Sequence, residues 1–215
     1  MPDSADSFSS LPETAPQGRS CAESMRRIMH RVQPLPEDCW EDISSLLRLR
    51  EYRRGESFAE VGDFPRDMAF ICSGVFRSFY RTEDGVEYNK TFFTEDTFMV
   101  ALTAMIRGEK NLINIEALCD SRVLLLDYHR FTELFDRHQF LERLTRKVIE
   151  LEWAKKEIRE IRLVLNNATE RYRFFLEEHP GLENRIPQYH IASYLGITPI
   201  QLSRIRAKLA AGDER

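Results

Sequence analysis

The side chains with the most specific chemistry in this sequence lie between Thr198 and Leu209. This segment holds three basic residues, Arg204, Arg206 and Lys208, and no acidic residue. Guanidinium and ammonium groups on one short segment can pair with phosphates and with the edges of bases. The 215-residue chain has 31 Lys and Arg against 35 Asp and Glu and a net charge of −4. Binding to nucleic acid would therefore have to come from such a local patch.

The residues just upstream predict that segment 188–209 forms a helix-turn-helix. Ile191 and Leu195 are spaced to bury one face of a first helix. Ala192 is small, as is needed where two helices cross closely, and Gly196 stands at the turn, where the backbone must be left-handed. An ordinary helical hairpin with a solvated basic face is the alternative.

The second helix of this segment has its own start signal and its own apolar face. Thr198 offers an N-cap hydroxyl, and Pro199 stands at the first helical position, where a missing N–H does no harm. The apolar residues predicted to point inward are Leu202, Ile205 and Leu209. The polar residues left on the other faces are Gln201, Ser203, Arg204, Arg206 and Lys208.

A long helix is predicted ahead of this segment, because apolar residues recur at steps of three and four from Leu141 to Leu165. At 1.5 Å per residue, roughly 25 residues make a rod of about 37 Å, which one small domain cannot cover. The stripe is narrow and flanked by charges, as in the seam of a coiled coil. We expect a two-fold dimer, with an ordinary core helix as the alternative. The expected seam residues are Leu144, Val148, Leu151, Ile158, Ile161 and Leu165.

Residues 48–126 have a different texture, in which glycines separate short runs of β-branched and aromatic residues. Residues 77–88 predict a hairpin that turns at Asp84-Gly85. Residues 113–118 alternate with a period of two, and residues 122–126 predict a buried strand. Many short strands at short intervals indicate a sandwich, a barrel or a roll. With the helices on either side, the predicted fold class is α+β.

The terminal motif carries a family resemblance. Residues 190–206 resemble the DNA-binding end of the cyclic-AMP-receptor/FNR superfamily of bacterial transcription regulators. The upstream segments that are similar to the family's β-roll and linker helices are 54–56, 62–63, 71–77, 170–172 and 179–180. The resemblance covers roughly Leu46 to Leu209. It implies a β-roll like a cyclic-nucleotide-binding domain, a dimerisation helix and a helix-turn-helix.

With that resemblance, four segments are expected along the chain. Residues 1–20, rich in Ser, Pro and Asp, predict a disordered arm. Residues 21–138 would form the β-roll sensor domain with its flanking helices. Residues 139–167 would form the dimerisation helix and a hinge, and residues 168–215 the helix-turn-helix domain.

The resemblance also implies a function, that of a homodimeric transcription regulator. Two recognition helices would enter successive major grooves about 34 Å apart on an inverted repeat of double-stranded DNA. Arg204 matches a base-contacting arginine of the family and could grip guanine through two hydrogen bonds. Pro199 and Ile200 stand where well-known members have Arg and Glu, so the half-site should differ. The expected DNA-contacting residues are Thr198, Gln201, Ser203, Arg204, Arg206 and Lys208.

Cyclic nucleotides are not expected as effectors. Members that bind them have a Gly-Glu pair and, ten residues after the Glu, an Arg followed by Ser or Thr. This sequence has Val100-Ala101 and Asn111-Leu112 at those positions. A phosphate without its cationic partner would lose a strong charge-assisted bond. The roll would then hold an unidentified small-molecule effector, or nothing.

Metal and redox cofactors are not expected either. Cys21, Cys39, Cys72 and Cys119 are scattered, without the spacing of a zinc or iron–sulfur site. They should be reduced thiols that act mostly as small apolar residues. His30 is a conceivable haem ligand, but a lone histidine is more often a surface residue.

The remaining function classes are an enzyme, a membrane protein and a sensor without DNA binding. Residues 44–128 contain no histidine, which disfavours a metal-dependent enzyme built on a β-roll. The sequence shows no catalytic constellation, no secretory signal and no apolar run long enough to span a membrane, so a cytoplasmic protein is expected. The chain ends soon after the second helix, so no wing is expected. The alternative function is a small-ligand sensor with a vestigial, non-DNA-binding helix-turn-helix.

Overall fold

The structure is a computed structural model that describes residues 9–10 and 16–211. These residues group into two units, which are described separately. The roll unit comprises the residues up to Arg77 together with Phe92–Ile149, and the helical unit comprises Ser78–Thr91 and the residues from Glu150 onward. The units are discontinuous in sequence, because the outer part of one hairpin groups with the C-terminal helices.

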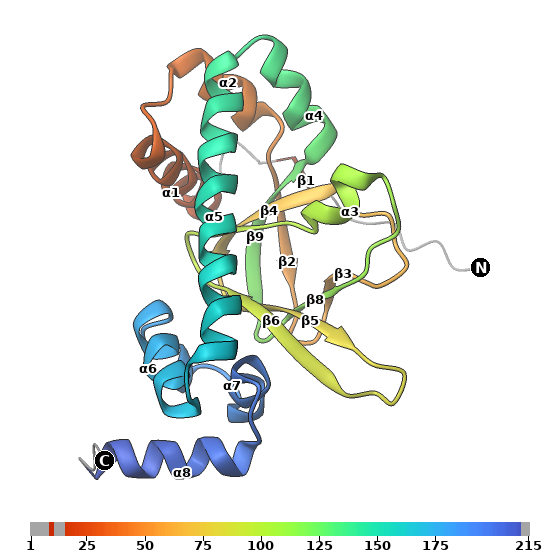
Figure 1. Cartoon of the computed structure of the whole chain (residues 1–215). Coiled ribbons are helices and arrows are strands. Elements are labelled where there is room, and N and C mark those ends of the chain that lie inside the picture. Colours follow the sequence, from red (N-terminus) through yellow and green to blue (C-terminus); the bar gives the residue numbers. More distant parts are fainter. Residues whose placement is uncertain (1–8, 11–15, 212–215) are drawn as a thin grey trace. The chain divides into compact units, whose positions relative to one another are not determined.

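The strands of the described residues form two sheets (Figure 1). One has the order β1-β2-β9-β4-β7 and the other the order β3-β8-β5-β6. The strands are β1 (Ser9–Ser10), β2 (Arg48–Tyr52), β3 (Ser57–Ala59), β4 (Asp67–Ser73), β5 (Phe76–Arg81), β6 (Glu87–Phe93), β7 (Phe98–Met99), β8 (Asn114–Ala117) and β9 (Ser121–Asp127). The predicted hairpin and the two predicted strands after it are therefore confirmed, and the fold class is α+β.

The helices follow the predicted order. Two of them precede the roll and are separated by a segment that contains Pro34 and Pro36. The helices are α1 (Pro16–Val32), α2 (Glu37–Ser45), α3 (Leu102–Arg107), α4 (Tyr128–Glu133), α5 (Gln139–Leu165), α6 (Ala168–Glu178), α7 (Gln188–Leu195) and α8 (Pro199–Ala210), with 3-10 helices η1 (Leu134–Asp136) and η2 (Leu182–Asn184). Figure 1 shows α6, α7 and α8 gathered at the C-terminal end of α5. Among the described residues, none of these helices combines the length and the apolar character needed to span a membrane.

Strand β9 separates two apolar cores of the roll unit. Its neighbours β2 and β4 both pair with it in antiparallel register, and successive side chains of a strand point to opposite faces. Leu124 and Leu126 pack into a cluster with residues of α1, α2 and the start of α5. Val123 and Leu125 pack on the other face, inside the roll. The run of apolar residues in β9 is thus explained by burial on both faces.

Gly74 marks a close approach within the roll unit. It lies between β4 and β5 at φ +110°, and a Cβ built there would come within 2.0 Å of the Ser121 hydroxyl. Gly74 also donates its N–H to the Glu95 carboxylate at 2.8 Å. A side chain at this position would therefore clash with the start of β9 as well as strain the backbone.

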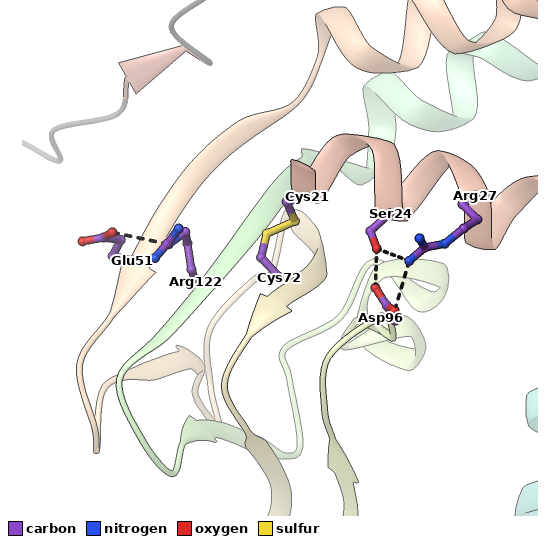
Figure 2. Close-up of a disulfide and its surroundings, with 7 residues drawn as sticks. All are labelled: Cys21, Ser24, Arg27, Glu51, Cys72, Asp96 and Arg122. Atoms are coloured by element: carbon purple, nitrogen blue, oxygen red, sulfur yellow. Dashed lines mark hydrogen bonds and ion pairs between the residues drawn. A yellow bond between two sulfur atoms is a disulfide. The ribbon is translucent and has the colours of Figure 1, made fainter. Parts of the chain in front are cut away.

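One expectation about the N-terminal region is wrong. Cys21 and Cys72 are not reduced thiols but form a disulfide between α1 and β4, with their Cα atoms 5.3 Å apart (Figure 2). Spacing along the chain gave no sign of it, because the partners are 51 residues apart. The predicted disordered arm overlaps β1 and the start of α1, and its other positions lie outside the described residues.

Helix α1 is attached to the roll at a second point beside the disulfide. Ser24 donates its hydroxyl hydrogen to Asp96 at 2.8 Å, and Arg27 lies 3.7 Å from the same carboxylate (Figure 2). Asp96 lies in the turn between β6 and β7 at φ +62°, and its own N–H donates to Ile71. Helix α1 therefore contacts both one end of β4 and the turn between β6 and β7.

The other two cysteines remain thiols. Cys39 is fully buried among the residues that join α1, α2 and α5. Burial, and then the nearby Asp38 and Asp42 charges, raise the pKa of its thiol to about 11. Cys39 thus acts as a small apolar residue, as expected, while Cys119 is half-buried. His30 accepts a hydrogen bond from the Leu35 N–H at 3.0 Å, which is a local structural role.

Candidate nucleic-acid interface

The turn between α7 and α8 has the expected geometry. Gly196 adopts the left-handed conformation at φ +67°, which a residue with a Cβ adopts only at a cost. Its N–H donates to the Ser193 carbonyl at 3.2 Å, and the Ile197 N–H donates to the Ala192 carbonyl at 3.0 Å. Ile191, Ala192 and Leu195 are buried beneath the crossing.

Helix α8 begins with a complete capping box. The Thr198 hydroxyl accepts the Gln201 N–H at 3.2 Å, and the Gln201 Oε1 accepts the Thr198 N–H at 2.9 Å. The Thr198 hydroxyl hydrogen also points to that Oε1, at 3.2 Å. Both polar side chains at the start of α8 are thus engaged with each other. Their role in DNA contact, expected from the sequence, would require this box to share or release its hydrogen bonds.

The two faces of α8 differ as the apolar spacing predicts. Leu202 and Ile205 are buried, and Leu209 is partly buried. Of the predicted DNA-contacting residues, all except Arg206 are exposed; these are Thr198, Gln201, Ser203, Arg204 and Lys208. Arg206 is half-buried, and its charge acts on Tyr172, where it opposes the rise in pKa that burial of the phenol causes. Arg206 therefore has a neighbour within the helical unit itself.

Helix α7 is held from the side by residues of the hairpin segment 78–91. The buried Asn89 side chain donates to the His190 carbonyl at 3.0 Å and lies 3.3 Å from the His190 Nδ1. The Asn89 N–H donates to the Ser193 hydroxyl at 3.0 Å, and that hydroxyl donates to the Glu87 carbonyl at 2.8 Å. We call Asn89, His190, Ser193 and Glu87 the hairpin–α7 junction.

Arg159 extends the junction to α5. Its guanidinium lies 4.4 Å from the centre of the Tyr194 ring and donates to the Tyr194 carbonyl at 3.0 Å. It also donates to the Asn89 carbonyl at 3.4 Å. One arginine thus connects α5, the hairpin segment and the last turn of α7, and a cation over an aromatic face adds to these hydrogen bonds.

The apolar stripe of α5 changes character along the helix. Leu144 is 3% exposed and packs in the core of the roll unit, so it is buried within its own subunit. In the helical unit the expected seam residues face solvent, and Ile161 and Leu165 are 50% and 76% exposed. Leu151 and Ile158 are exposed as well, while Val148 is half-buried. Contiguous exposed apolar surface of this kind is common at protein–protein contacts.

Apolar side chains of the described residues pack together in the interior of the roll. Tyr52, Phe76 and Met99 are buried there, and the Tyr52 and Phe76 rings meet edge to face at 5.4 Å. A surface hollow of about 270 Å³ lies outside this interior, beside Arg130, Leu134 and other residues of α4 and η1.

Asn111 and Ala101 occupy the positions where the resemblance places a phosphate-binding arginine and a ribose-binding glutamate. Ala101 is buried in front of α3. Asn111 is also buried, and its amide donates to the Glu60 carbonyl at 3.0 Å and to the Ile113 carbonyl at 2.6 Å. Its backbone pairs with Gly62 and Asp63. Asn111 therefore joins two loops of the roll and offers no cation.

The β-roll is a domain of a known family. Residues 49–138 match the family model for the cyclic nucleotide-binding domain, so the β-roll predicted from the resemblance is confirmed. A search of curated protein sequences gave no match.

The fold of the chain is that of Crp/Fnr family transcription regulators. It is similar to FixK2 from Bradyrhizobium japonicum, with a TM-score of 0.67 and 20% identity over 77% of this chain and 85% of that one. CLP from Xanthomonas campestris, a regulator that responds to c-di-GMP, gives 0.62 and 16% over 80% and 90%. The Thermus thermophilus catabolite activator protein gives 0.53 and 17% over 86% and 87%.

Sequence reasoning missed the hairpin–α7 junction and the disulfide. Asn89 and His190 are 101 residues apart, and a single Asn in a strand gives no sign of its partner. The burial of β6 does not alternate, since its two buried residues, Asn89 and Phe92, are three positions apart, so the strand period gave no signal for Asn89. A buried polar residue needs partners, but the sequence does not say where they lie.

Proposed function

We propose that the chain is a homodimeric, sequence-specific DNA-binding transcription regulator whose recognition helix is α8. The observation that carries this proposal is the arrangement of α8 itself. Leu202 and Ile205 fix the helix to the unit, and Arg204 stands on the opposite, exposed side. The second helix of a helix-turn-helix enters the major groove with its N-terminal residues toward the bases, and a free guanidinium there can bind guanine O6 and N7.

A second copy of the chain is the partner that the exposed stripe of α5 fits. The residues Leu151, Ile158, Ile161 and Leu165 follow heptad-like steps in the same unit as α8. The flanks carry ion pairs within the helix, such as Lys155 with Glu152 at 2.6 Å. An apolar seam between charged flanks favours two parallel copies of one helix, and a two-fold dimer would present two copies of α8 to an inverted repeat.

Selection from a pool of random DNA duplexes tests this function. The wild-type dimer should enrich an inverted repeat. The logarithm of its association constant should fall linearly with the logarithm of the salt concentration. Arg204→Ala should cost about 1–3 kcal/mol per half-site and relax the selected sequence at one position. Lys110→Ala removes an exposed charge from the roll unit, away from α5 and α8, and should change neither. If no sequence is enriched even at low salt, the chain is a ligand sensor with a vestigial helix-turn-helix.

The roll is proposed to act without cyclic AMP or cyclic GMP. Asn111, whose amide binds the Glu60 carbonyl, stands where the resemblance places the cation that a cyclic phosphate needs. Titration calorimetry with both nucleotides should show no heat of binding, and c-di-GMP, to which the structurally similar CLP responds, is a useful third probe. Micromolar binding of cyclic AMP or cyclic GMP would contradict the proposal. The proposed function is regulatory rather than enzymatic.

A further inference from the structure

The outward face of α8 begins with an exposed isoleucine. Ile200 is 67% exposed, whereas Leu202 and Ile205 on the same helix are 0% and 9% exposed. Single exposed apolar residues are common on protein surfaces and need no explanation by themselves. Ile200 lies in the first turn of the proposed recognition helix, and the residues of that turn approach the edges of the bases. Its exposure is therefore relevant to DNA recognition. The inference therefore rests on the proposed function of α8.

The side chains beside Ile200 are not available to read a base in the same way. Thr198 and Gln201 hold each other in the capping box. Pro199 is an apolar ring without an N–H. Of the first helical turn, Ile200 is therefore the exposed side chain that is large and makes no contact within the capping box.

Ile200 also shares its face of the helix with the residues best suited to contact DNA. Residues three, four and seven positions apart lie on one side of a helix, so Ile200, Ser203, Arg204 and Ala207 form one row. All four are exposed. Seven residues span about 10 Å at 1.5 Å each, which is about three base-pair steps of 3.4 Å. The row thus offers, in order, a branched alkyl group, a hydroxyl, a guanidinium and a methyl group.

The chemistry of Ile200 restricts what it can recognise. It has no donor or acceptor, so it cannot distinguish base edges by hydrogen bonds. The major groove offers one apolar group, the C5-methyl of thymine. We propose that Ile200 reads the C5-methyl group of a thymine in each half-site. Because Ile200 and Arg204 are one helical turn apart, about 6 Å, this thymine lies within about two base pairs of the guanine that Arg204 contacts.

Replacing thymine with deoxyuracil tests the proposal, because it removes the methyl group alone. The duplex used is the operator that the wild-type protein selects. A buried methyl contact at each half-site predicts that affinity falls about 4-fold for one substituted half-site and about 15-fold for both. In Ile200→Ala the same substitution should change affinity less than 2-fold, because the partner of the methyl group is gone.

The control and the opposing outcomes separate this inference from the proposed function. Val86→Ala shortens another exposed aliphatic residue of the helical unit and should leave the full effect of deoxyuracil in place. A selected operator without a thymine near the guanine, or one that binds equally well with deoxyuracil, overturns the role of Ile200 and leaves that of Arg204 intact. A protein that selects no operator overturns both.

Discussion

In the roll unit, helix α1 is attached to β4 by a disulfide and by a large apolar cluster, whereas in the helical unit the hairpin segment is attached to α7 by the hydrogen bonds around Asn89. Apolar packing is non-directional, and a disulfide is a covalent bond that does not break when neighbouring residues shift. A hydrogen-bond network is worth about 1 kcal/mol per bond and requires every partner in place. The helical unit also leaves much of its apolar surface exposed. The roll unit thus satisfies most of its apolar surface internally, whereas the helical unit exposes the surfaces through which the proposed function would bind DNA and a second subunit.

The largest expected effect is on the proposed dimerisation through the helical unit. Ile161→Glu would place a carboxylate in the proposed seam of both subunits, where it would be desolvated and face its own copy. The dimer should dissociate at micromolar concentration, and DNA binding should fall at least 100-fold. Sedimentation equilibrium measures the mass directly.

A matched control for the seam is Trp153→Glu. Trp153 is 65% exposed on α5, but at about 100° per residue it points roughly 120° away from the stripe. This variant should remain dimeric. If Trp153→Glu dissociates the dimer and Ile161→Glu does not, α5 pairs through a different face.

The next largest effect concerns the disulfide of the roll unit. In a chain-entropy description, a cross-link across 51 residues contributes about 4 kcal/mol to the free energy of unfolding. The double variant Cys21→Ser, Cys72→Ser should lose this amount in urea denaturation. A thiol reductant should lower the stability of the wild-type protein equally and that of the variant not at all. Cys119→Ser removes a free thiol and should stay within about 0.5 kcal/mol.

Asn89 provides the corresponding test in the helical unit. Asn89→Ala removes the side-chain amide that donates a hydrogen bond to the His190 carbonyl. A buried carbonyl left without a donor lowers the free energy of unfolding by about 1–3 kcal/mol. Hydrogen exchange should become faster in α7 and stay unchanged in β9. Glu83→Ala, at an exposed position of the same hairpin, is the control. Equal acceleration in both units would show that the junction is not a local attachment.

The sequence predicted those parts of the molecule that depend on local rules. The apolar steps of α5, the Asp84-Gly85 turn, the Thr198-Pro199 start and the Gly196 turn each follow from the conformational preference of a few adjacent residues. The Cys21–Cys72 bond and the Asn89–His190 contact could not be predicted, because each joins residues more than fifty positions apart. The residues adjacent to each partner in the sequence give no indication of the other partner. The exposure of Ile200 falls between these cases: the helical period predicts its face, but only the structure shows that the capping box engages its neighbours.

The smallest expected effect is a pH dependence confined to the helical unit. His179 packs against the rings of Phe175 and Tyr194, 5.2 and 5.9 Å away between centres. Burial lowers the pKa of His179 below its ordinary value of 6.5, with Glu178 opposing and Lys155 adding to the shift. The unfolded chain therefore takes up the proton first as pH falls. Stability is full above pH 6.5 and decreases below it, by at most about 1.4 kcal/mol per pH unit.

Hydrogen exchange of α7 between pH 7.5 and 5.5, corrected for the intrinsic pH dependence of exchange, measures this decrease. His179→Gln should remove most of it, because glutamine does not titrate. His129→Gln, which changes an exposed histidine of the roll unit, should retain it. If the two variants lose protection equally on acidification, the titrating group lies elsewhere, and the difference in pH response between the two units disappears with it.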